Sequence, residues 1–225
     1  MGGAIGEVLA FGVGVAVSPL AVIAVVVMLD AQPGRAGAAA FLVAWAAGLA
    51  TVGTLALLLA DEVDASDGGD PATWVSVLKI VLAALLLVVA ARQWRARPDA
   101  GEQPELPGWM SSLDGNTPAR SARLALLFAC VKPKNLLLTV GAALAIAQTG
   151  AAPAAQAVAL AVFVLLGSLA PGIPFAIHVV MRERGAATLA AIRAWMEREN
   201  TTIIVVLCLV LAAKLAGDGL SALAG

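Results

Sequence analysis

Charge, aromatic side chains and cysteine are all scarce in this chain of 225 residues. Only 13% of the residues are charged and 4% are aromatic, whereas 61% are hydrophobic. Soluble domains carry about 25% charged and about 45–50% apolar residues. This composition excludes a disordered chain, a nucleic-acid-binding protein and a disulfide scaffold. The class that remains is a protein that crosses a membrane several times.

Six long apolar segments are present, and we interpret each as one span of a bilayer core about 30 Å thick. They cover residues 4–29, 37–60, 74–91, 121–148, 154–181 and 201–216. The first segment lacks a basic leader and carries Glu7, so we expect it to be retained as a mature span. The sequence therefore predicts an all-α, polytopic integral membrane protein with six transmembrane helices.

Acidic and basic residues are separated between the predicted loops. Residues 61–70 hold five acids and no base, whereas the loops 92–123 and 182–198 hold five and four arginines. Because positively charged loops stay on the cytoplasmic side, we expect both arginine loops inside and both termini outside. Within the last loop, residues 186–197 are interpreted as a short interfacial helix, with a solvated connector as the alternative.

The two halves of the chain share a pattern. A Ser18-Pro19 pair interrupts the first span, and a Pro/Lys segment at residues 132–135 interrupts the fourth. With three spans per half, the second half must be inverted relative to the first, and inverted halves with proline-interrupted helices are typical of transporters. We therefore predict two inverted three-helix repeats, over residues 1–91 and 121–225. A cytoplasmic linker over residues 92–120, containing an interfacial segment, would join them.

The most informative charges lie at the second break. Lys132 is nine residues beyond Arg123, or about 14 Å deeper at the helical rise of about 1.5 Å per residue. A lysine side chain extends only about 6 Å, so it does not reach the surface by snorkelling. No acid lies in the middle of any span, which favours a bound anion as the partner. The predicted anion site consists of Ser18, Pro19, Lys132, Pro133, Lys134 and Asn135.

Alternatives to this site stay open. The lysines could be structural or held by water, and Ser18 and Asn135 could bond the local backbone at the breaks. Lys79 and Lys214, near the outer ends of their spans, are expected to snorkel. His178, the only histidine, closes a fifth span that we expect to be broken at residues 171–174. It is a candidate proton relay, with a structural histidine as the alternative.

Catalytic motifs are absent from the sequence: it has no GxSxG, HExxH or P-loop, and no metal-ligand spacing. We therefore expect no cofactor and no metal, and we favour a transporter that moves an anionic lipid or its headgroup outward. Two other classes stay open. One is a membrane-embedded enzyme that relays an acyl or phosphoryl group through a lysine or His178, and the other is an accessory scaffold for lipid-assembly enzymes.

One long segment also resembles a known family. The stretch that begins at Trp109 reads WMSSLDGNTPARSARLALLFACVKPKNLLLTVGAALAIA. It resembles the signature of the sulfolipid-addressing (GAP, glycolipid-addressing) proteins, in which a Thr-Pro turn precedes a span with Pro-Lys-Asn and a leucine run. The segments VAVSPLAVIAVVVML and FLVAWAAGLA fit the same family, so the resemblance covers essentially the whole chain. This chain has Lys132 where the family more often has asparagine.

The resemblance implies further expectations. That family is similar to the lysine-exporter superfamily, whose members have two inverted triplets of spans and are often dimers. It implies a plasma-membrane protein that delivers glycolipids or peptidoglycolipids to the cell surface, as a homodimer and beside cell-envelope lipid biosynthesis enzymes. Thiol-disulfide electron carriers of the superfamily need a cysteine before each proline. Here Cys130 precedes Pro133, but the matching residue before Pro19 is Ala16, which excludes redox chemistry.

Overall fold

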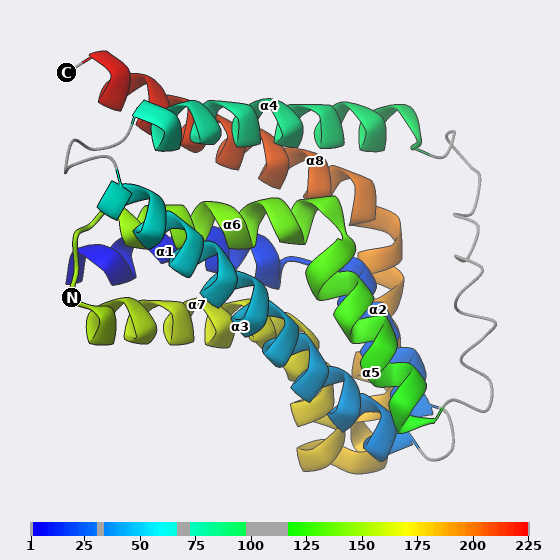
Figure 1. Ribbon diagram of the computed structural model, residues 1–225. Coiled ribbons are helices and arrows are strands. Elements are labelled where there is room, and N and C mark those ends of the chain that lie inside the picture. Colours follow the sequence, from blue (N-terminus) through cyan, green and yellow to red (C-terminus); the bar gives the residue numbers. More distant parts are fainter. Residues whose placement is uncertain (1, 31–33, 67–72, 98–116, 225) are drawn as a thin grey trace.

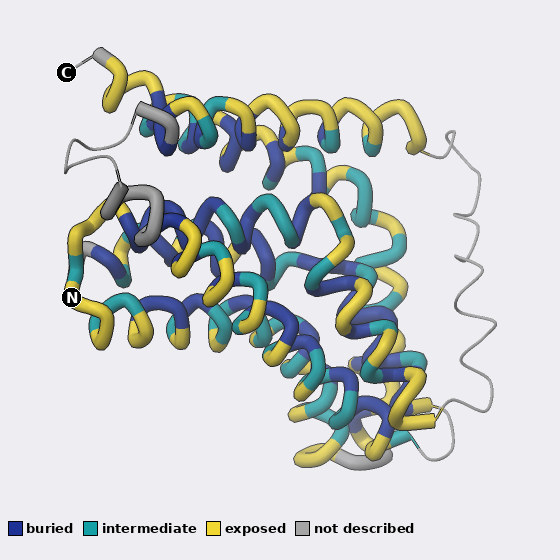
Figure 2. Tube along the Cα trace, in the orientation of Figure 1, coloured by how far each residue is buried: buried dark blue, intermediate teal, exposed yellow. Residues whose placement is uncertain are grey.

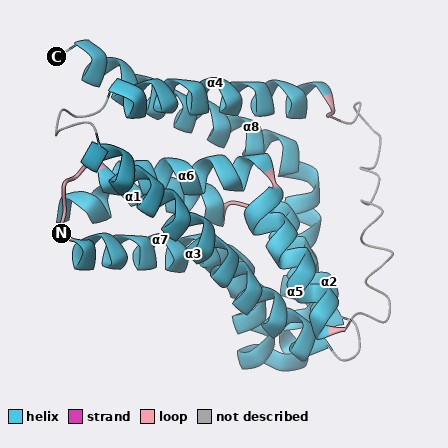
Figure 3. Ribbon diagram, viewed as in Figure 1, coloured by secondary structure: helices cyan, strands magenta, loops and turns pink. Residues whose placement is uncertain are grey.

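The computed structural model describes residues 2–30, 34–66, 73–97 and 117–224, in which every regular element is a helix (Figure 1; Figure 3). The first half contains α1 (Gly2–Ala16), α2 (Pro19–Asp30), α3 (Gly34–Ser66) and α4 (Thr73–Arg95). The second half contains α5 (Pro118–Leu126), the π-helical turn η2 (Leu127–Val131), α6 (Pro133–Ala147), α7 (Pro153–Met181), the 3₁₀ turn η3 (Arg182–Gly185) and α8 (Ala186–Ala224). Residues 98–116 of the predicted linker lie outside the described residues.

The helices have the length and composition of membrane spans. Four of them, α3, α4, α7 and α8, are each long and apolar enough to cross a bilayer. Two bent pairs raise the number to as many as six: α1 and α2 meet at 53°, and the α5–η2 segment meets α6 at 61°. Both bends lie where the sequence predicts breaks. Continuous helices are the expected form because lipid offers no partner to an open backbone.

Two predicted boundaries are wrong. Helix α8 is unbroken from Ala186 to Ala224, so residues 186–197 belong to the same helix as the predicted span 201–216. Helix α7 continues through Pro171, where a break was predicted. Proline has no N–H to offer the carbonyl four residues earlier, which is that of Gly167. The indole Nε1 of Trp45 donates to that carbonyl oxygen at 3.2 Å, so the carbonyl freed by Pro171 has a donor.

Two groups of helices make up the bundle. Helix α4 packs along α8, and α4 and the C-terminal part of α8 form a layer at the top of Figure 1; we call these two helices the α4–α8 pair. Helix α1 packs against α6 and α7, and α3 packs against α5, α6 and α7. Aromatic rings fill the centre of this second group: Phe41 stacks on Trp45, with ring centroids 6.0 Å apart, and meets Phe128 edge-on at 6.3 Å.

The outer surface of the bundle is apolar. Val43, Leu165 and Val180 are 72%, 68% and 81% exposed, and exposed residues line the outward faces of the helices in Figure 2. So much exposed apolar surface is unusual for a protein in water and is expected for helices that face lipid. The two chain ends lie at the same end of the bundle in Figure 1, and we call this the terminal end.

Candidate functional site

The break between α1 and α2 leaves at least three carbonyl oxygens without their helical donors, those of Gly14, Val15 and Val17. The N–H of Ser18 bonds the carbonyl of Ala16 at 2.7 Å instead of that of Gly14. The N–H of Ala21 bonds the carbonyl of Ser18 at 3.0 Å instead of that of Val17. Pro19 directly follows Ser18 and has no N–H, so the carbonyl of Val15 also lacks its helical donor. The carbonyls of Gly14 and Val17 therefore need donors from elsewhere.

Lys134 supplies those donors. Its Nζ lies 2.8 Å from the carbonyl oxygen of Gly14 and 2.9 Å from that of Val17. Lys134 is in the first turn of α6, so this contact joins the two broken segments to each other. Among the described residues it forms no ion pair. These contacts fit the structural alternative for Lys134, which also borders the cavity described below.

The second break is repaired in a similar way by Asn135. The N–H of Lys132 bonds the carbonyl of Leu127 at 3.2 Å, which is the π-helical spacing. In that spacing the donor for Phe128 would be Pro133, which has no N–H. The Nδ2 of Asn135 donates to the Phe128 carbonyl at 2.8 Å instead. Asn135 is fully buried and its Nδ2 serves the backbone, whereas its Oδ1 has no hydrogen-bond partner among the described residues. Its role as a ligand donor stays a prediction.

Lys132 is the lysine for whose ammonium the described residues provide neither a hydrogen bond nor an ion pair. Its Nζ lies over the ring of Phe128, 4.1 Å from the centroid. Within the described part of the chain it has no hydrogen bond to a side chain and no carboxylate partner. Lys132 is half-buried, and a cation–π contact of this kind is worth about 0.5–2 kcal/mol. Among the described residues, Lys132 is therefore the lysine at the breaks whose ammonium has neither a hydrogen bond nor a charged partner.

A cavity of about 340 Å³ brings the predicted residues together. Of the six predicted site residues, Ser18, Pro19, Lys132, Pro133 and Lys134 border it, and Asn135 does not. Two polar residues that the sequence analysis did not select, Arg92 and Gln93 at the end of α4, complete the polar wall. The remaining lining is apolar: Leu20, Val89, Ala96 and Ile204.

The sequence analysis did not select Arg92 as a site residue, because an arginine at the cytoplasmic end of a span is already explained by the orientation of the protein in the membrane. The repeat pattern could not reveal it either, because Arg92 comes from a helix without a break. Only the fold brings the end of α4 beside the starts of α2 and α6. The cavity thus has three basic side chains in its lining, Arg92, Lys132 and Lys134, and no acid among its described lining residues.

His178 lies apart from this cavity. It is in the last turn of α7 and borders a second, larger cavity of about 1020 Å³. That cavity also has Asp30, Arg35 and Arg184 in its wall. The structure therefore does not bring His178 together with the lysines at the breaks.

The two remaining lysines have partners within the protein. Lys214 of α8 forms ion pairs with Glu7 of α1 at 3.0 Å and with Asp218 at 2.7 Å. Lys79 of α4 is buried and donates a hydrogen bond to Gln148, which directly follows α6. Snorkelling, as predicted from the sequence, is therefore not what satisfies these two ammonium groups.

Comparison with known proteins adds one match. A profile of the family described as Sap, sulfolipid-1-addressing protein, matches residues 8–221. A search of curated proteins found no match, and a search of solved structures found none. The match covers both broken helix pairs and every residue of the 340 Å³ cavity. The chain therefore belongs to the sulfolipid-1-addressing protein family.

Proposed function

We propose that this protein is a membrane transporter that binds an anionic lipid or glycolipid headgroup in the 340 Å³ cavity and exports it to the cell surface. The observation that carries the proposal is the unpaired ammonium of Lys132 beside Arg92, in a cavity whose described walls contain no acid. An anion held there would neutralise charge that the protein itself leaves uncompensated. The description of the family names the addressing of a sulfolipid, which agrees with a lipid ligand.

The apolar part of the cavity suits a lipid. Leu20, Val89 and Ile204 lie beside the cations, so one wall is charged and the others are hydrocarbon. A headgroup could occupy the charged side while the acyl chains stay in the bilayer. The cavity would then need to enclose only part of the molecule, which fits its volume near the lower end of ligand pockets.

Reciprocal packing supports the inverted three-helix repeats on which transport would depend. If α1–α4 correspond to α5–α8, contacts between the halves should come in exchanged pairs. Three such pairs are present, whereas the contact of α1 with α6 has no comparable counterpart between α5 and α2 among the described residues. Helix α1 packs on α7 as α5 packs on α3, α2 packs on α8 as α6 packs on α4, and α2 packs on α7 as α6 packs on α3. Such pairs of exchanged contacts are expected when a two-fold axis relates the halves.

The proposed orientation has the terminal end outside, at the plasma membrane. The ends of α4 and α7 and the start of α5 lie at the other end of the bundle, where the arginine-rich loops begin. With that end inside, the cavity mouth beside Arg92 faces the cytoplasm, from which a newly made lipid would enter. The homodimer and the contact with lipid-assembly enzymes stay predictions.

The proposal is tested by native mass spectrometry of the purified protein. We expect wild-type protein to retain an anionic lipid and Lys132→Met to lose most of it. Arg95→Gln is the matched control, because it also removes one cation but lies at the end of α4 outside the cavity lining. Equal retention by wild type and Lys132→Met would overturn the proposal. A covalent adduct on Lys132 would instead favour the membrane-embedded relay enzyme. Normal function in cells by a protein that retains no lipid would favour the accessory scaffold.

A further inference from the structure

Two lysines tie the α4–α8 pair to the rest of the bundle near its terminal end. Lys214 of α8 is 3.0 Å from Glu7 of α1, and it also pairs with Asp218 one turn along its own helix. Lys79 of α4 donates to Gln148 at the end of α6. Each tie therefore joins one helix of the α4–α8 pair to one of the two helices that carry the breaks.

The charges of this group balance. The carboxylates of Asp218 and Glu7 act electrostatically on the buried ammonium of Lys79, as does Lys214. The five residues Glu7, Lys79, Gln148, Lys214 and Asp218, which we call the tie cluster, thus contain two ammonium groups and two carboxylates. A balanced cluster offers no net charge to a bound anion. It is unlike the cavity around Lys132, and substrate binding does not explain it.

Further along the bundle, the 340 Å³ cavity lies between the α4–α8 pair and the starts of α2 and α6. The 340 Å³ cavity has Arg92 and Gln93 of α4 and Ile204 of α8 on one side. The starts of α2 and α6, with Ser18 and Lys132, form the other side. The α4–α8 pair is therefore tied to α1 and α6 near the terminal end, and the cavity separates α4 from the breaks further along, where α8 still packs on α2.

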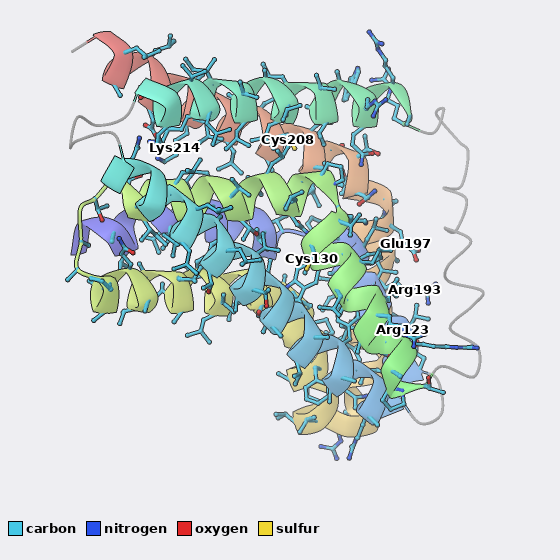
Figure 4. The ribbon with its side chains drawn as sticks, viewed as in Figure 1. Arg123, Cys130, Arg193, Glu197, Cys208 and Lys214 are labelled. Atoms are coloured by element: carbon cyan, nitrogen blue, oxygen red, sulfur yellow. The ribbon has the colours of Figure 1, made fainter. Side chains whose placement is uncertain are left out.

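Apolar contacts close the space between the tie cluster and the cavity. A Cβ added to Gly14 would lie only 2.6 Å from Leu211 of α8 and 3.0 Å from Leu138 of α6. Cys208 of α8 is 1% exposed on the same buried face. In Figure 4, Cys208 and Lys214 lie in order along α8 toward the chain end. The cavity is thus sealed toward the terminal end by one tightly packed layer and the ion pairs beyond it.

We propose that the tie cluster is the gate that closes the headgroup site toward the terminal end. Rocking of the α4–α8 pair breaks the ties, opens the layer at Gly14 and Leu211, and closes the mouth at Gln93. This gate rests on the proposed transport function and explains how one site could face the two sides in turn. Ion pairs with partial exposure suit such a gate because each is weak enough to break within a transport cycle.

The test uses the native Cys208 as a reporter in a Cys130→Ser background. Cys208 lies six residues before Lys214, or about 9 Å at the helical rise of about 1.5 Å per residue. In lipid nanodiscs we expect Glu7→Gln to raise the rate of maleimide labelling of Cys208 about two- to fivefold, the effect of losing one partly exposed ion pair. Adding Lys79→Met should raise it further. The conservative Glu7→Asp variant should keep most of the protection.

A second reporter distinguishes rocking from local loosening. Gln93→Cys, in a chain with both native cysteines replaced by serine, reports on the mouth of the cavity. A gate requires that Glu7→Gln lower the labelling of this residue while it raises that of Cys208. Faster labelling at both positions would overturn the rocking motion. Unchanged labelling of Cys208 in the Glu7→Gln/Lys79→Met protein would overturn the gate.

Arg193→Gln is the matched control for loss of an ion pair. Arg193 pairs with Glu197 at 2.8 Å within α8 itself, distant from Lys214 along the helix in Figure 4, and ties no second helix. It should leave both labelling rates unchanged. Lipid retention in Lys132→Met is measured separately. A retained lipid with unchanged labelling would refute the gate alone, and altered labelling without any retained lipid would refute the transport function alone.

Discussion

The ammonium of Lys134 lies 2.8 Å from the carbonyl oxygen of Gly14, a residue 120 positions earlier in the chain. The contact joins the two broken helix pairs at the point where each loses its regular hydrogen bonds. It also separates the roles of two neighbouring lysines. Lys134 serves the backbone, whereas Lys132 faces the cavity without a protein counter-ion.

Replacing Lys134 should therefore destabilise the fold. Lys134→Met leaves the carbonyls of Gly14 and Val17 without donors, and we expect it to lower the free energy of unfolding by about 2 kcal/mol or more. Unfolding in mixed micelles with increasing dodecyl sulfate measures this change. Lys132→Met, two residues away, should leave stability nearly unchanged because Lys132 holds no backbone group. Equal stability of the two variants would contradict the structural role of Lys134.

Arg92 should contribute to lipid binding, although less than Lys132. Arg92→Gln removes a cation at the exposed rim of the cavity, and an exposed ion pair contributes about 0.2–1 kcal/mol. The expected result is about a two- to fivefold weaker retention of anionic lipid, measured by native mass spectrometry over a series of lipid concentrations. Arg95→Gln, on the next turn of α4, should have no such effect. An equal loss in both variants would indicate general surface charge rather than the cavity.

Asn135 should matter for stability and not for binding. Asn135→Leu removes the donor to the Phe128 carbonyl, and we expect a loss of about 1–2 kcal/mol in the free energy of unfolding. The lipid retained per folded molecule should stay the same, because Asn135 does not border the cavity. Loss of lipid from Asn135→Leu protein that is still folded would show that Asn135 contributes to lipid binding.

Trp45 should stabilise the helix that carries Pro171. Trp45→Phe keeps the aromatic ring but leaves the carbonyl of Gly167 without a donor, which is expected to lower stability by about 0.6–1.7 kcal/mol. Trp195→Phe is the control, since Trp195 is 49% exposed on α8. Similar unfolding midpoints for the two variants would show that the indole hydrogen bond contributes little.

Any side chain at position 34, where Gly34 begins α3, should destabilise the protein. An added Cβ would lie 2.6 Å from the carbonyl oxygen of Met28 and 2.7 Å from that of Leu29, and a backbone cannot move aside as a side chain can. We expect Gly34→Ala to destabilise the protein by about 1–3 kcal/mol. Gly172→Ala, where no atom lies within 4 Å, should be neutral or stabilising by up to about 1 kcal/mol. Unfolding of the two variants side by side measures the difference.

The sequence by itself determined that the chain is a helical membrane protein and located both breaks. Long apolar runs leave the backbone no partners except its own, and proline removes the donor at a fixed position, so both features are local. The same reasoning failed at Pro171. The carbonyl freed by that proline is bonded by Trp45, which is 122 residues away from Gly167 in sequence. No local pattern carries that information.

Only the tertiary structure decided which lysine at the breaks is hydrogen-bonded to the protein and which is not. The sequence marks Lys132 and Lys134 alike, as cations far from any acid. The fold brings the freed carbonyls of α1 to Lys134 and the end of α4, with Arg92, to Lys132. The physical reason is that a buried ammonium can be satisfied by neutral backbone oxygens as well as by an acid. A search of the sequence for charged partners cannot find such oxygens, because every residue has one.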